Sequence, residues 1–414
     1  MLSLQKKYEK NMETIKVIAG WLPEEKEIGT LSFEKVRQAE MYSFEYSNDW
    51  LKDSKSFSID RELPLVKGRM FSQNGIFKCF TDAMPDRWGR NLIEIRDYQV
   101  SKRRSRLTSW DYLINIEDSL RSGGFRFKNQ DGNYVSNSDV RHIPPIVGLN
   151  ELMQAACEIE KSTRTHSIPD NRWVERLFRP GSAVGGARPK ACVKEGNDLY
   201  IAKFPSISDD IDKGKWEHFA HRMAAECGID VAETRIIESA NDSILLSKRF
   251  DRNGEKRIHM ASSMSLLGYD DGTDGSSGKG YFDIVEFIVG NCADAEKNLE
   301  ELYRRVAFGI CIGNCDDHFR NHSFLLTEKG WTLSPAYDLN PSLDRHHAIL
   351  INSETDESDL DILVNYCEEY MLDAKTARGI VSDVVREMKY WEKIARDCGL
   401  SRSEMNYFRD RFDC

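Results

Sequence analysis

The most informative stretch of the chain is Gly313-Asn314-Cys315-Asp316-Asp317-His318-Phe319-Arg320-Asn321, which is polar and follows an apolar helical segment, Leu302 to Ile312. The alternation after it predicts a hairpin, His322–Leu326 with Trp331–Ser334, and Ala336-Tyr337-Asp338 comes next. An Asp, an Asn five residues later and a second Asp beyond a hairpin thus lie in one region. Since Asp and Asn also favour turns, the stretch taken alone fits a plain helix end and loop equally well.

Two carboxylates and an amide in this order match the needs of a phosphoryl-transfer site. One carboxylate positions a nucleophilic hydroxyl group, and the amide and the second carboxylate hold Mg²⁺. Protein kinases also space their catalytic Asp and Asn by five residues and follow them with a metal-binding Asp. The spacing makes Asp316 the candidate base and Asn321 a candidate ligand, and we expect Asp317 to be a solvated neighbour.

Length and composition indicate a folded protein of two or three domains. The chain has 414 residues, of which 40% are hydrophobic and 30% charged, as is ordinary for a soluble globular protein. Its longest apolar runs are too short to span a bilayer, and residues 1–20 have no apolar core of a signal peptide, so we expect a cytoplasmic protein without membrane contact. The net charge of −10 argues against a protein that covers nucleic acid by itself.

Ten cysteines are scattered along the chain without a C-x-x-C pair. Free thiols in a reducing cytoplasm are the natural interpretation. Cys311 and Cys315 lie near His318, but no second pair of ligands matches them, so a zinc site is disfavoured.

Periodicity predicts an α+β chain whose first third is mainly β and whose last third is mainly helical. The strands expected in the first third are Thr14–Trp21, Ile28–Phe33 and Met41–Tyr46. The helices expected in the last third are Ile284–Val289, Ala295–Ile312, Asp359–Leu372, Ala374–Cys398 and Arg402–Phe412. Pro144-Pro145 marks a boundary. The predicted division is a β-rich domain over 1–145, a lobe with a glycine-rich loop over 146–250, and a helical lobe over 251–414.

Upstream segments supply the other parts of a nucleotide site. Gly181-Ser182-Ala183-Val184-Gly185-Gly186-Ala187-Arg188-Pro189-Lys190 could bring backbone N–H groups close to phosphates, although a simple turn fits it as well. A predicted strand, Asp198–Phe204, carries Lys203 next to its last residue, where a kinase keeps its phosphate-binding lysine, and the alternative is a lysine that reaches solvent. Glu217, in the first turn of a predicted helix, Trp216–Cys227, could orient Lys203 or could simply favour the helix N-terminus.

The segment Ile244-Leu245-Leu246-Ser247-Lys248-Arg249-Phe250-Asp251-Arg252 is predicted to be a strand that runs into a polar turn. In a kinase the chain passes between the lobes here, along the adenine, and Phe250 could pack near the base. A plain edge strand is the alternative. The basic cluster Lys102, Arg103, Arg104 and Arg106 fits either a solvated loop or a surface that faces a partner.

The order of these parts resembles the HipA family of bacterial serine/threonine kinases, the toxin components of toxin–antitoxin pairs. The resemblance covers nearly the whole chain. It rests on the stretches Gly185–Lys190, Lys248–Arg252, Gly313–Asn321 and Leu333–Asp338, and on two N-terminal ones, Met84–Arg90 and Asp111-Tyr112-Leu113 through Arg121-Ser122-Gly123-Gly124. It implies a kinase-like bilobal α+β fold with a small β-rich N-terminal domain and a helical C-terminal lobe.

The resemblance also implies roles for single residues, with ATP and Mg²⁺ as cofactors. Asp316 would be the catalytic base, and Asn321 and Asp338 the Mg²⁺ ligands. Residues expected to contact the nucleotide are Ser182, Ala183, Val184, Gly185, Gly186, Lys203, Lys248, Phe250 and His318, of which His318 occupies the place of a family histidine and would orient the loop.

One departure from the family pattern concerns regulation. Family members are commonly silenced by phosphorylation of a serine at the place that Ala183 occupies here, and the neighbouring serine is Ser182.

The resemblance points to a toxin that phosphorylates a component of the translation machinery. The expected partners are a protein substrate and a small helix-turn-helix antitoxin, with DNA reached only through that antitoxin. Two alternatives stay open from the residues: a kinase for a small molecule or lipid head group, and a catalytically silent nucleotide-binding co-repressor of a DNA-binding antitoxin.

Overall fold

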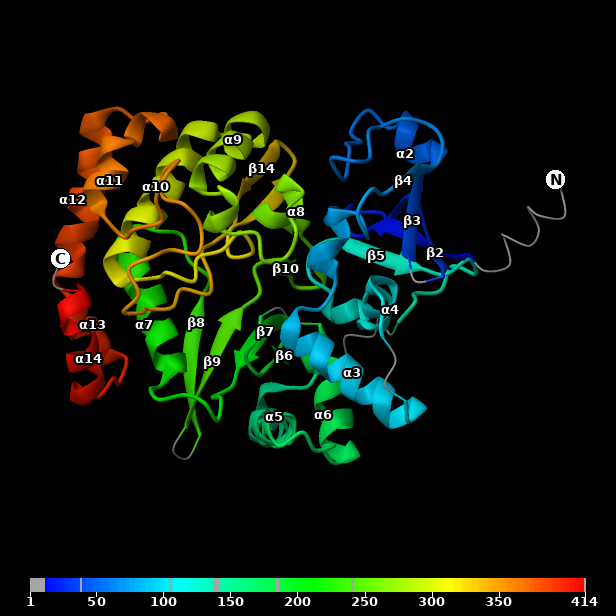
Figure 1. Ribbon diagram of the computed structural model, residues 1–414, viewed down its shortest axis with the longest axis horizontal. Helices are drawn as coiled ribbons and strands as arrows, with labels where there is room; N and C mark the ends of the chain where they lie inside the picture. Colours follow the sequence, from blue (N-terminus) through cyan, green and yellow to red (C-terminus); the bar gives the residue numbers. More distant parts are fainter. Residues whose placement is uncertain are drawn as a thin grey trace, which may run out of the picture. The chain divides into compact units, whose positions relative to one another are not determined.

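The computed structural model describes residues 12–37, 39–103, 106–136, 142–183, 186–239 and 242–412. Contacts within the chain divide it into two compact units (Figure 1). The first unit runs to Leu199 and also includes Asp251–His259; the second comprises Tyr200–Phe250 and Met260–Cys414. The predicted division into 1–145, 146–250 and 251–414 stays a prediction.

The first unit contains a five-stranded antiparallel sheet with the order β4-β3-β2-β1-β5. Its strands are β1 (Glu13–Ala19), β2 (Lys26–Val36), β3 (Ala39–Tyr46), β4 (Met70–Phe71) and β5 (Phe125–Lys128). Alternate residues of β1 and β3, such as Val17 and Phe44, are buried in one core. This period of two is the pattern that predicted the three N-terminal strands, and their prediction is confirmed.

Helices and short strands complete the first unit. The helices are α2 (Asn48–Lys52), α3 (Arg87–Ser101), α4 (Ser109–Asn115), α5 (Leu149–Arg164) and α6 (Asn171–Ser182). The strands are β6 (Lys190–Glu195), β10 (Arg252–Asn253) and β11 (Lys256–Arg257), and the 3-10 turns are Lys78–Ala83, Asp118–Leu120 and Ile146–Gly148. Helix α6 was not predicted, because Pro180, Gly181 and Ser182 in its last turn hide its C-terminal end in a stretch that resembles a loop.

The second unit combines two small sheets with a helical body. Its strands are β7 (Asp198–Lys203), which begins in the first unit, β8 (Thr234–Ser239), β9 (Asp242–Lys248), β12 (Met260–Ser262), β13 (Ser323–Thr327) and β14 (Gly330–Leu333). Strand β9 pairs antiparallel with β7 and β8, and helix α7 (Lys213–Glu226) packs against β8 and β9. The predicted hairpin after Asn321 is confirmed as β13 and β14, with β12 added at its edge.

The remaining helices of the second unit are α8 (Ser263–Leu267), α9 (Tyr281–Asn291), α10 (Ala295–Ile312), α11 (Leu360–Asn365), α12 (Ala374–Met388), α13 (Trp391–Asp397) and α14 (Arg402–Phe412), with 3-10 turns at Gly275–Ser277 and Cys367–Tyr370. The single helix predicted over Ala374–Cys398 is wrong, because Lys389 and Tyr390 separate α12 from α13. Buried Met388 and Trp391 keep the apolar spacing across this break, so periodicity does not reveal it.

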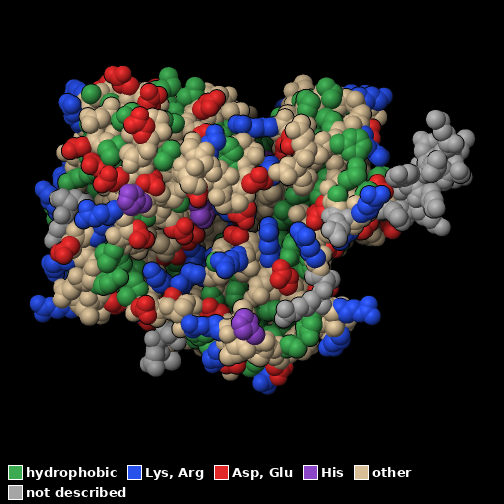
Figure 2. Space-filling view, in the orientation of Figure 1, with side chains coloured by type: hydrophobic (Ala, Val, Ile, Leu, Met, Phe, Trp, Pro, Cys, Tyr) green, Lys and Arg blue, Asp and Glu red, His purple; other side chains and the backbone are tan. Residues whose placement is uncertain are grey.

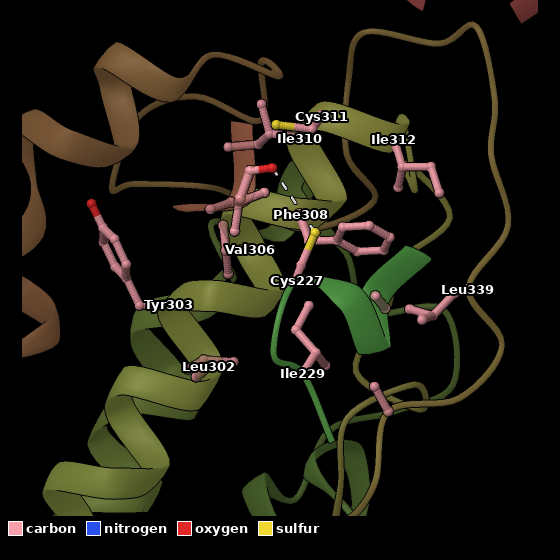
Figure 3. Packing of buried hydrophobic residues seen from close by; sticks show 14 of the residues in the cluster. Cys227, Ile229, Leu302, Tyr303, Val306, Phe308, Ile310, Cys311, Ile312 and Leu339 are labelled. Atoms are coloured by element: carbon pink, nitrogen blue, oxygen red, sulfur yellow. Dashed lines mark hydrogen bonds between the residues drawn. The ribbon is translucent and has the colours of Figure 1, made fainter. Parts of the chain in front are cut away.

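Helix α10 lies at the centre of the core of the second unit. Figure 3 shows Val306 and Phe308 of this helix close to Cys227 and Ile229, which follow α7, and to Leu339, which follows Asp338. Burial of Leu339 fixes the backbone beside Asp338, so the packing of the core also positions the candidate site.

One face of the molecule carries side chains of mixed character (Figure 2). Figure 2 shows acidic, basic and apolar side chains intermixed on the face that it displays. Within the described part of the chain, no helix has both the length and the apolar character to cross a bilayer.

Candidate active site

The polar stretch Gly313–Asn321, called the Asp316 loop from here on, begins where α10 ends. Gly313 caps the helix with a left-handed backbone, at a φ of +72°, and its carbonyl oxygen accepts a hydrogen bond of 2.9 Å from the backbone N–H of Ser342. A Cβ at this position would overlap the Ser342 carbonyl oxygen, so glycine is required both by conformation and by space. The turn therefore brings the Asp316 loop against the segment that follows Asp338.

Asp317 is a buried anchor of this loop. Its Oδ2 accepts hydrogen bonds from the Tyr281 hydroxyl group at 2.5 Å and from His322 Nε2 at 3.0 Å. Burial alone would raise the pKa of Asp317, but His322 and the Tyr281 hydroxyl group outweigh it, and the pKa is lowered. The prediction that Asp317 is a solvated neighbour is therefore wrong.

Asp316 faces the other way, and its side chain is exposed to solvent. Partial desolvation raises its pKa above the usual aspartate value; His318 opposes this, and the carboxylates of Asp338 and Asp317 add to it. A base with raised proton affinity suits removal of a proton from a hydroxyl group. The anchored Asp317 thus leaves Asp316 at the surface of the loop, where a substrate could reach it.

Asn321 is oriented by the same loop. Its Nδ2 donates to the backbone carbonyl oxygen of Asp316 at 3.0 Å, and its own N–H donates to the carbonyl oxygen of His318 at 2.8 Å. Because the amide nitrogen is engaged in this way, Oδ1 is the atom of Asn321 suited to a metal. His318, which is half-buried, shapes the turn through its backbone, and its role toward a nucleotide stays a prediction.

Asp338 is held in an uncommon backbone conformation, with a φ of +57°. A left-handed conformation costs a residue other than glycine about 1–2 kcal/mol. Asn340 offsets this cost, because its Nδ2 lies 3.1 Å from both the carbonyl oxygen and Oδ1 of Asp338. The Asn340 N–H in turn donates to Oδ1 of buried Asn314 at 2.9 Å, which connects Asp338 to the Asp316 loop.

Lys203 connects Asp338 with helix α7. Its Nζ lies 2.5 Å from Asp338 Oδ1 and 2.6 Å from Oε1 of buried Glu217. Burial disfavours the charged ammonium group, but the two carboxylates outweigh it and raise the pKa of Lys203. The predicted pairing of Lys203 with Glu217 is present. Since α7 begins at Lys213, Glu217 lies beyond its first turn and does not serve as an N-terminal charge.

The end of β9 brings one aromatic residue to the same region. Phe250 packs against Tyr337, with ring centroids 5.4 Å apart, directly before Asp338. Lys248 lies at the end of the strand, with Nζ 3.9 Å from Glu233 Oε2. Contact of Phe250 and Lys248 with a nucleotide stays a prediction.

The glycine-rich stretch belongs to the first unit. Ser182 is the last residue of α6, its side chain lies outside the described part of the structure, and Ala183 is buried. Val184 and Gly185 also lie outside the described residues. Gly186 donates its N–H to Asp86 Oδ2 at 2.7 Å.

The candidate ligands of a metal are few. Within the described residues, no group of three or more His, Cys, Asp or Glu side chains could hold a metal ion. One carboxylate and one amide oxygen, from Asp338 and Asn321, are hard ligands of the kind that bind Mg²⁺ together with substrate phosphates. The residues therefore fit Mg²⁺ delivered with a nucleotide, and they lack the side chains of a closed protein site.

Comparison with known proteins identifies the family. Residues 182–391 match the model of the HipA-like C-terminal domain, and residues 20–109 match the HipA N-terminal domain. The chain belongs to the HipA family. The serine/threonine-protein kinase toxin HipA of Shewanella oneidensis is 23% identical over 340 residues, which cover 75% of this chain and 72% of that protein. Toxin YjjJ of Escherichia coli is 25% identical over 330 residues, or 76% and 68% of the two chains.

A solved structure of the HipA family supports the fold. The complex of Shewanella oneidensis MR-1 HipA with HipB and operator DNA matches this chain with a TM-score of 0.65 at 18% identity, covering 96% of this chain and 95% of that one. The predicted kinase-like bilobal α+β fold is confirmed. The HipA relatives favour a serine/threonine protein kinase over a small-molecule kinase or a silent co-repressor.

Several residues of the site were not found from the sequence. Asn314 and Asn340 lie beside the predicted Asp residues, but their bonds bridge segments that are 26 positions apart. Tyr281 is 36 positions from Asp317. A buried polar residue has no periodic signal, so only the position of Asn314 within the polar stretch could have drawn attention to it.

Proposed function

We propose that the chain transfers a phosphoryl group from ATP to serine or threonine hydroxyl groups of a protein, in a Mg²⁺-dependent reaction of the HipA type. The observation that carries the proposal is the connected set of Lys203, Glu217 and Asp338 next to the Asp316 loop. Its parts occur in the order and with the pairings that phosphoryl transfer requires.

Each residue then has a separate task. Asp316 accepts the proton of the substrate hydroxyl group, and Asn321 holds the backbone of Asp316 in place. Lys203, oriented by Glu217, binds phosphate oxygens of the nucleotide. Mg²⁺ bound with ATP would offset negative charge on the phosphates, and Asp338 and Asn321 are the residues that would hold it. Ser182, Ala183, Val184, Gly185 and Gly186 would cover the triphosphate, and Lys248, Phe250 and His318 would complete the nucleotide site.

The proposed partners follow from the family. The related Shewanella oneidensis HipA was solved with HipB and operator DNA. We propose that this chain also binds a small helix-turn-helix antitoxin, and that it reaches DNA through that partner, in keeping with its net charge of −10. Its substrate would be a component of the translation machinery, so that phosphorylation would make the chain a toxin.

Asp316→Ala tests the enzyme directly. We expect phosphate transfer from labelled ATP to proteins of a bacterial lysate to fall by about 10²–10⁴-fold, since a general base contributes on this scale. Phosphoserine and phosphothreonine in the labelled protein would separate a protein kinase from a small-molecule kinase. Asp383→Ala, at a partly exposed position of α12, is the matched control and should retain full transfer. Unchanged transfer in Asp316→Ala with an intact fold would contradict the assignment.

A further inference from the structure

The N-terminal stretch Met84–Arg90, whose sequence resembles the family without an assigned role, lies against the glycine-rich stretch Gly181–Lys190. Asp86 begins helix α3 and uses both of its carboxylate oxygens. Oδ1 accepts the N–H of Arg87 at 2.7 Å, and Oδ2 accepts the N–H of Gly186 at 2.7 Å. One side chain therefore caps a helix and holds the backbone of a residue one hundred positions away.

Trp88 adds two further bonds on the same side. Its backbone N–H donates to the Gly186 carbonyl oxygen at 3.1 Å, and its indole Nε1 donates to the Lys190 carbonyl oxygen at 3.0 Å. Trp88 is buried, so these bonds are shielded from water and are costly to break. Together with Asp86, Trp88 holds the C-terminal half of the glycine-rich stretch.

The same helix also contacts α6, whose last residues, Gly181 and Ser182, begin that stretch. A Cβ at Gly181 would lie 2.7 Å from Leu92 Cδ1, so α3 and the end of α6 approach as closely as glycine allows. Further along, the Arg96 guanidinium group lies 3.9 Å from the centre of the Phe178 ring, and Gln99 Nε2 donates to the Pro169 carbonyl oxygen at 2.8 Å. Helix α3 thus contacts the chain on both sides of residues 182–185.

The backbone of Gly186 has a conformation that hydrogen bonds must hold in place. Its φ of +90° is outside the range of most residues, and a Cβ there would overlap Lys190 Nζ. A glycine loses more conformational entropy on ordering than any other residue, so fixing it in one conformation requires specific bonds. Asp86 accepts a hydrogen bond from the Gly186 N–H, and the Trp88 N–H donates one to the Gly186 carbonyl oxygen.

We propose that Asp86 and Trp88 are positioning residues for nucleotide binding, which hold the backbone of Gly186 and Lys190 in the conformation that receives the phosphates of ATP. The proposal rests on the proposed kinase function. It gives helix α3 the task of holding the candidate phosphate-binding residues of its own unit. Because Asp86 and Trp88 hold Gly186 and Lys190 without nucleotide, binding of ATP does not have to fix these two residues, and its affinity rises accordingly.

Asp86→Asn is the variant of choice. Asparagine caps helices as well as aspartate does, and its single oxygen can still accept the Arg87 N–H. An amide NH₂ group then faces the N–H of Gly186, and that bond is lost. Trp88→Phe is the second variant, because it keeps a buried aromatic ring and removes only the indole donor to Lys190. The matched control is Asp373→Asn, a helix cap of α12 that accepts from Lys375 and Thr376.

Three measurements are made on the full chain. Binding of a non-hydrolysable ATP analogue with Mg²⁺ should weaken roughly tenfold in Asp86→Asn, the loss expected for one charge-assisted hydrogen bond. Hydrogen exchange at the Gly186 amide should be roughly tenfold faster without nucleotide. In steady-state kinetics KM for ATP should rise while kcat at saturating ATP is kept, because the reacting groups are unchanged. Asp373→Asn should match the wild type in all three.

Binding and exchange do not depend on turnover, so the two hypotheses can fail separately. A wild type that transfers no phosphate would refute the proposed function. The affinity for the ATP analogue and the hydrogen exchange of the Gly186 amide in Asp86→Asn would still test the positioning role of Asp86. Equal affinity and equal Gly186 exchange in wild type, Asp86→Asn and Trp88→Phe would overturn the inference. A fall in kcat without a change in KM would also overturn it, because it would assign these residues to the chemical step.

Discussion

At the scale of single residues, two adjacent aspartates show how position decides role. Asp317 is buried between Tyr281 and His322, whereas Asp316 is exposed. Their pKa values shift in opposite directions, downward for Asp317 and upward for Asp316. A carboxylate with satisfied bonds stabilises the loop, and one without them stays available for chemistry.

Replacement of Asn340 should weaken Mg²⁺ binding at the candidate site, although Asn340 is not expected to contact the substrate. In Asn340→Ala the support of Asp338 in its left-handed conformation is lost. Because groups behind a metal ligand typically contribute 10- to 100-fold, we expect the Mg²⁺ concentration for half-maximal phosphate transfer to rise by about that factor. Titration of Mg²⁺ at fixed ATP measures it. The exposed Asn365→Ala on α11 serves as control, and an identical Mg²⁺ dependence of both variants would contradict the role of Asn340.

At the scale of elements, the turn from α10 into the Asp316 loop depends on one glycine. We expect Gly313→Ala to lower the free energy of unfolding by about 1–3 kcal/mol, because alanine is strained at a φ of +72° and its Cβ meets Ser342. Gly379→Ala is the matched control. Gly379 lies inside α12 with open space at its Cβ, so alanine there should stabilise by about 0.5–1 kcal/mol. Thermal unfolding compares the two, and a neutral Gly313→Ala would refute the strain argument.

The ion pairs that join Glu25, just before β2, to Arg126 and Lys128 of β5 depend on pH. Glu25 accepts hydrogen bonds from Lys128 Nζ at 2.8 Å and from the Tyr134 hydroxyl group at 2.6 Å, and it also pairs with Arg126. Burial opposes its ionisation, but these partners lower the pKa of Glu25 to about 2. A lowered pKa stabilises the folded state above the unfolded value of 4.5, and this contribution is lost as the pH falls toward about 2.

Glu25→Gln should therefore remove part of the acid sensitivity of the first unit. At pH 7 we expect it to cost roughly 1 kcal/mol, a value reduced for the partial exposure of the pair. The difference from the wild type should shrink between pH 4.5 and about 2. Denaturant unfolding across this range measures it, with the exposed Glu45→Gln on β3 as control. A difference that does not depend on pH would argue against the ion pairs as its cause.

At the scale of the whole molecule, the first unit includes a segment from much later in the chain. Asp251–His259 follows β9 in sequence but belongs to the first unit. Asp251 Oδ2 accepts from the Gly123 N–H at 2.8 Å and from Arg252 Nη1 at 2.7 Å, and Arg257 Nη2 reaches Asp118 Oδ2 at 3.0 Å. The Lys248–Arg252 stretch therefore has two tasks, since Phe250 packs beside Asp338 while Asp251 anchors the first unit.

Asp251→Ala tests this anchor. The substitution removes a carboxylate from the buried Arg252 side chain and the acceptor from the Gly123 N–H, so we expect a loss of about 3–5 kcal/mol in the free energy of unfolding. Denaturant unfolding of the full chain with a probe in the first unit measures it. Asp131→Ala, exposed in the same unit, should be close to neutral. A neutral Asp251→Ala would mean that the segment is held in some other way.

Part of the geometry of the candidate site could be predicted, because short spacings between residues indicate it. Asn321 follows Asp316 by five residues, and the hairpin and Asp338 come next in the sequence. The structure contains that hairpin. The order of the motifs predicted that Glu217 could orient Lys203, and Lys203 Nζ lies 2.6 Å from Glu217 Oε1. Bonds between distant segments, such as Tyr281 with Asp317 or Asp86 with Gly186, have no fixed spacing and could not be predicted.

Periodicity and local spacing, which are properties of adjacent residues, predicted strands, helices and candidates for chemistry, and the resemblance of short motifs predicted the family and its kinase-like α+β fold. The folded structure was needed to show which of Asp316 and Asp317 is exposed, what supports Asp338, and that α3 contacts the chain on both sides of residues 182–185. Burial and hydrogen-bond partners arise when segments far apart in the chain pack together. They therefore decide the role of a residue whose type alone leaves several roles open.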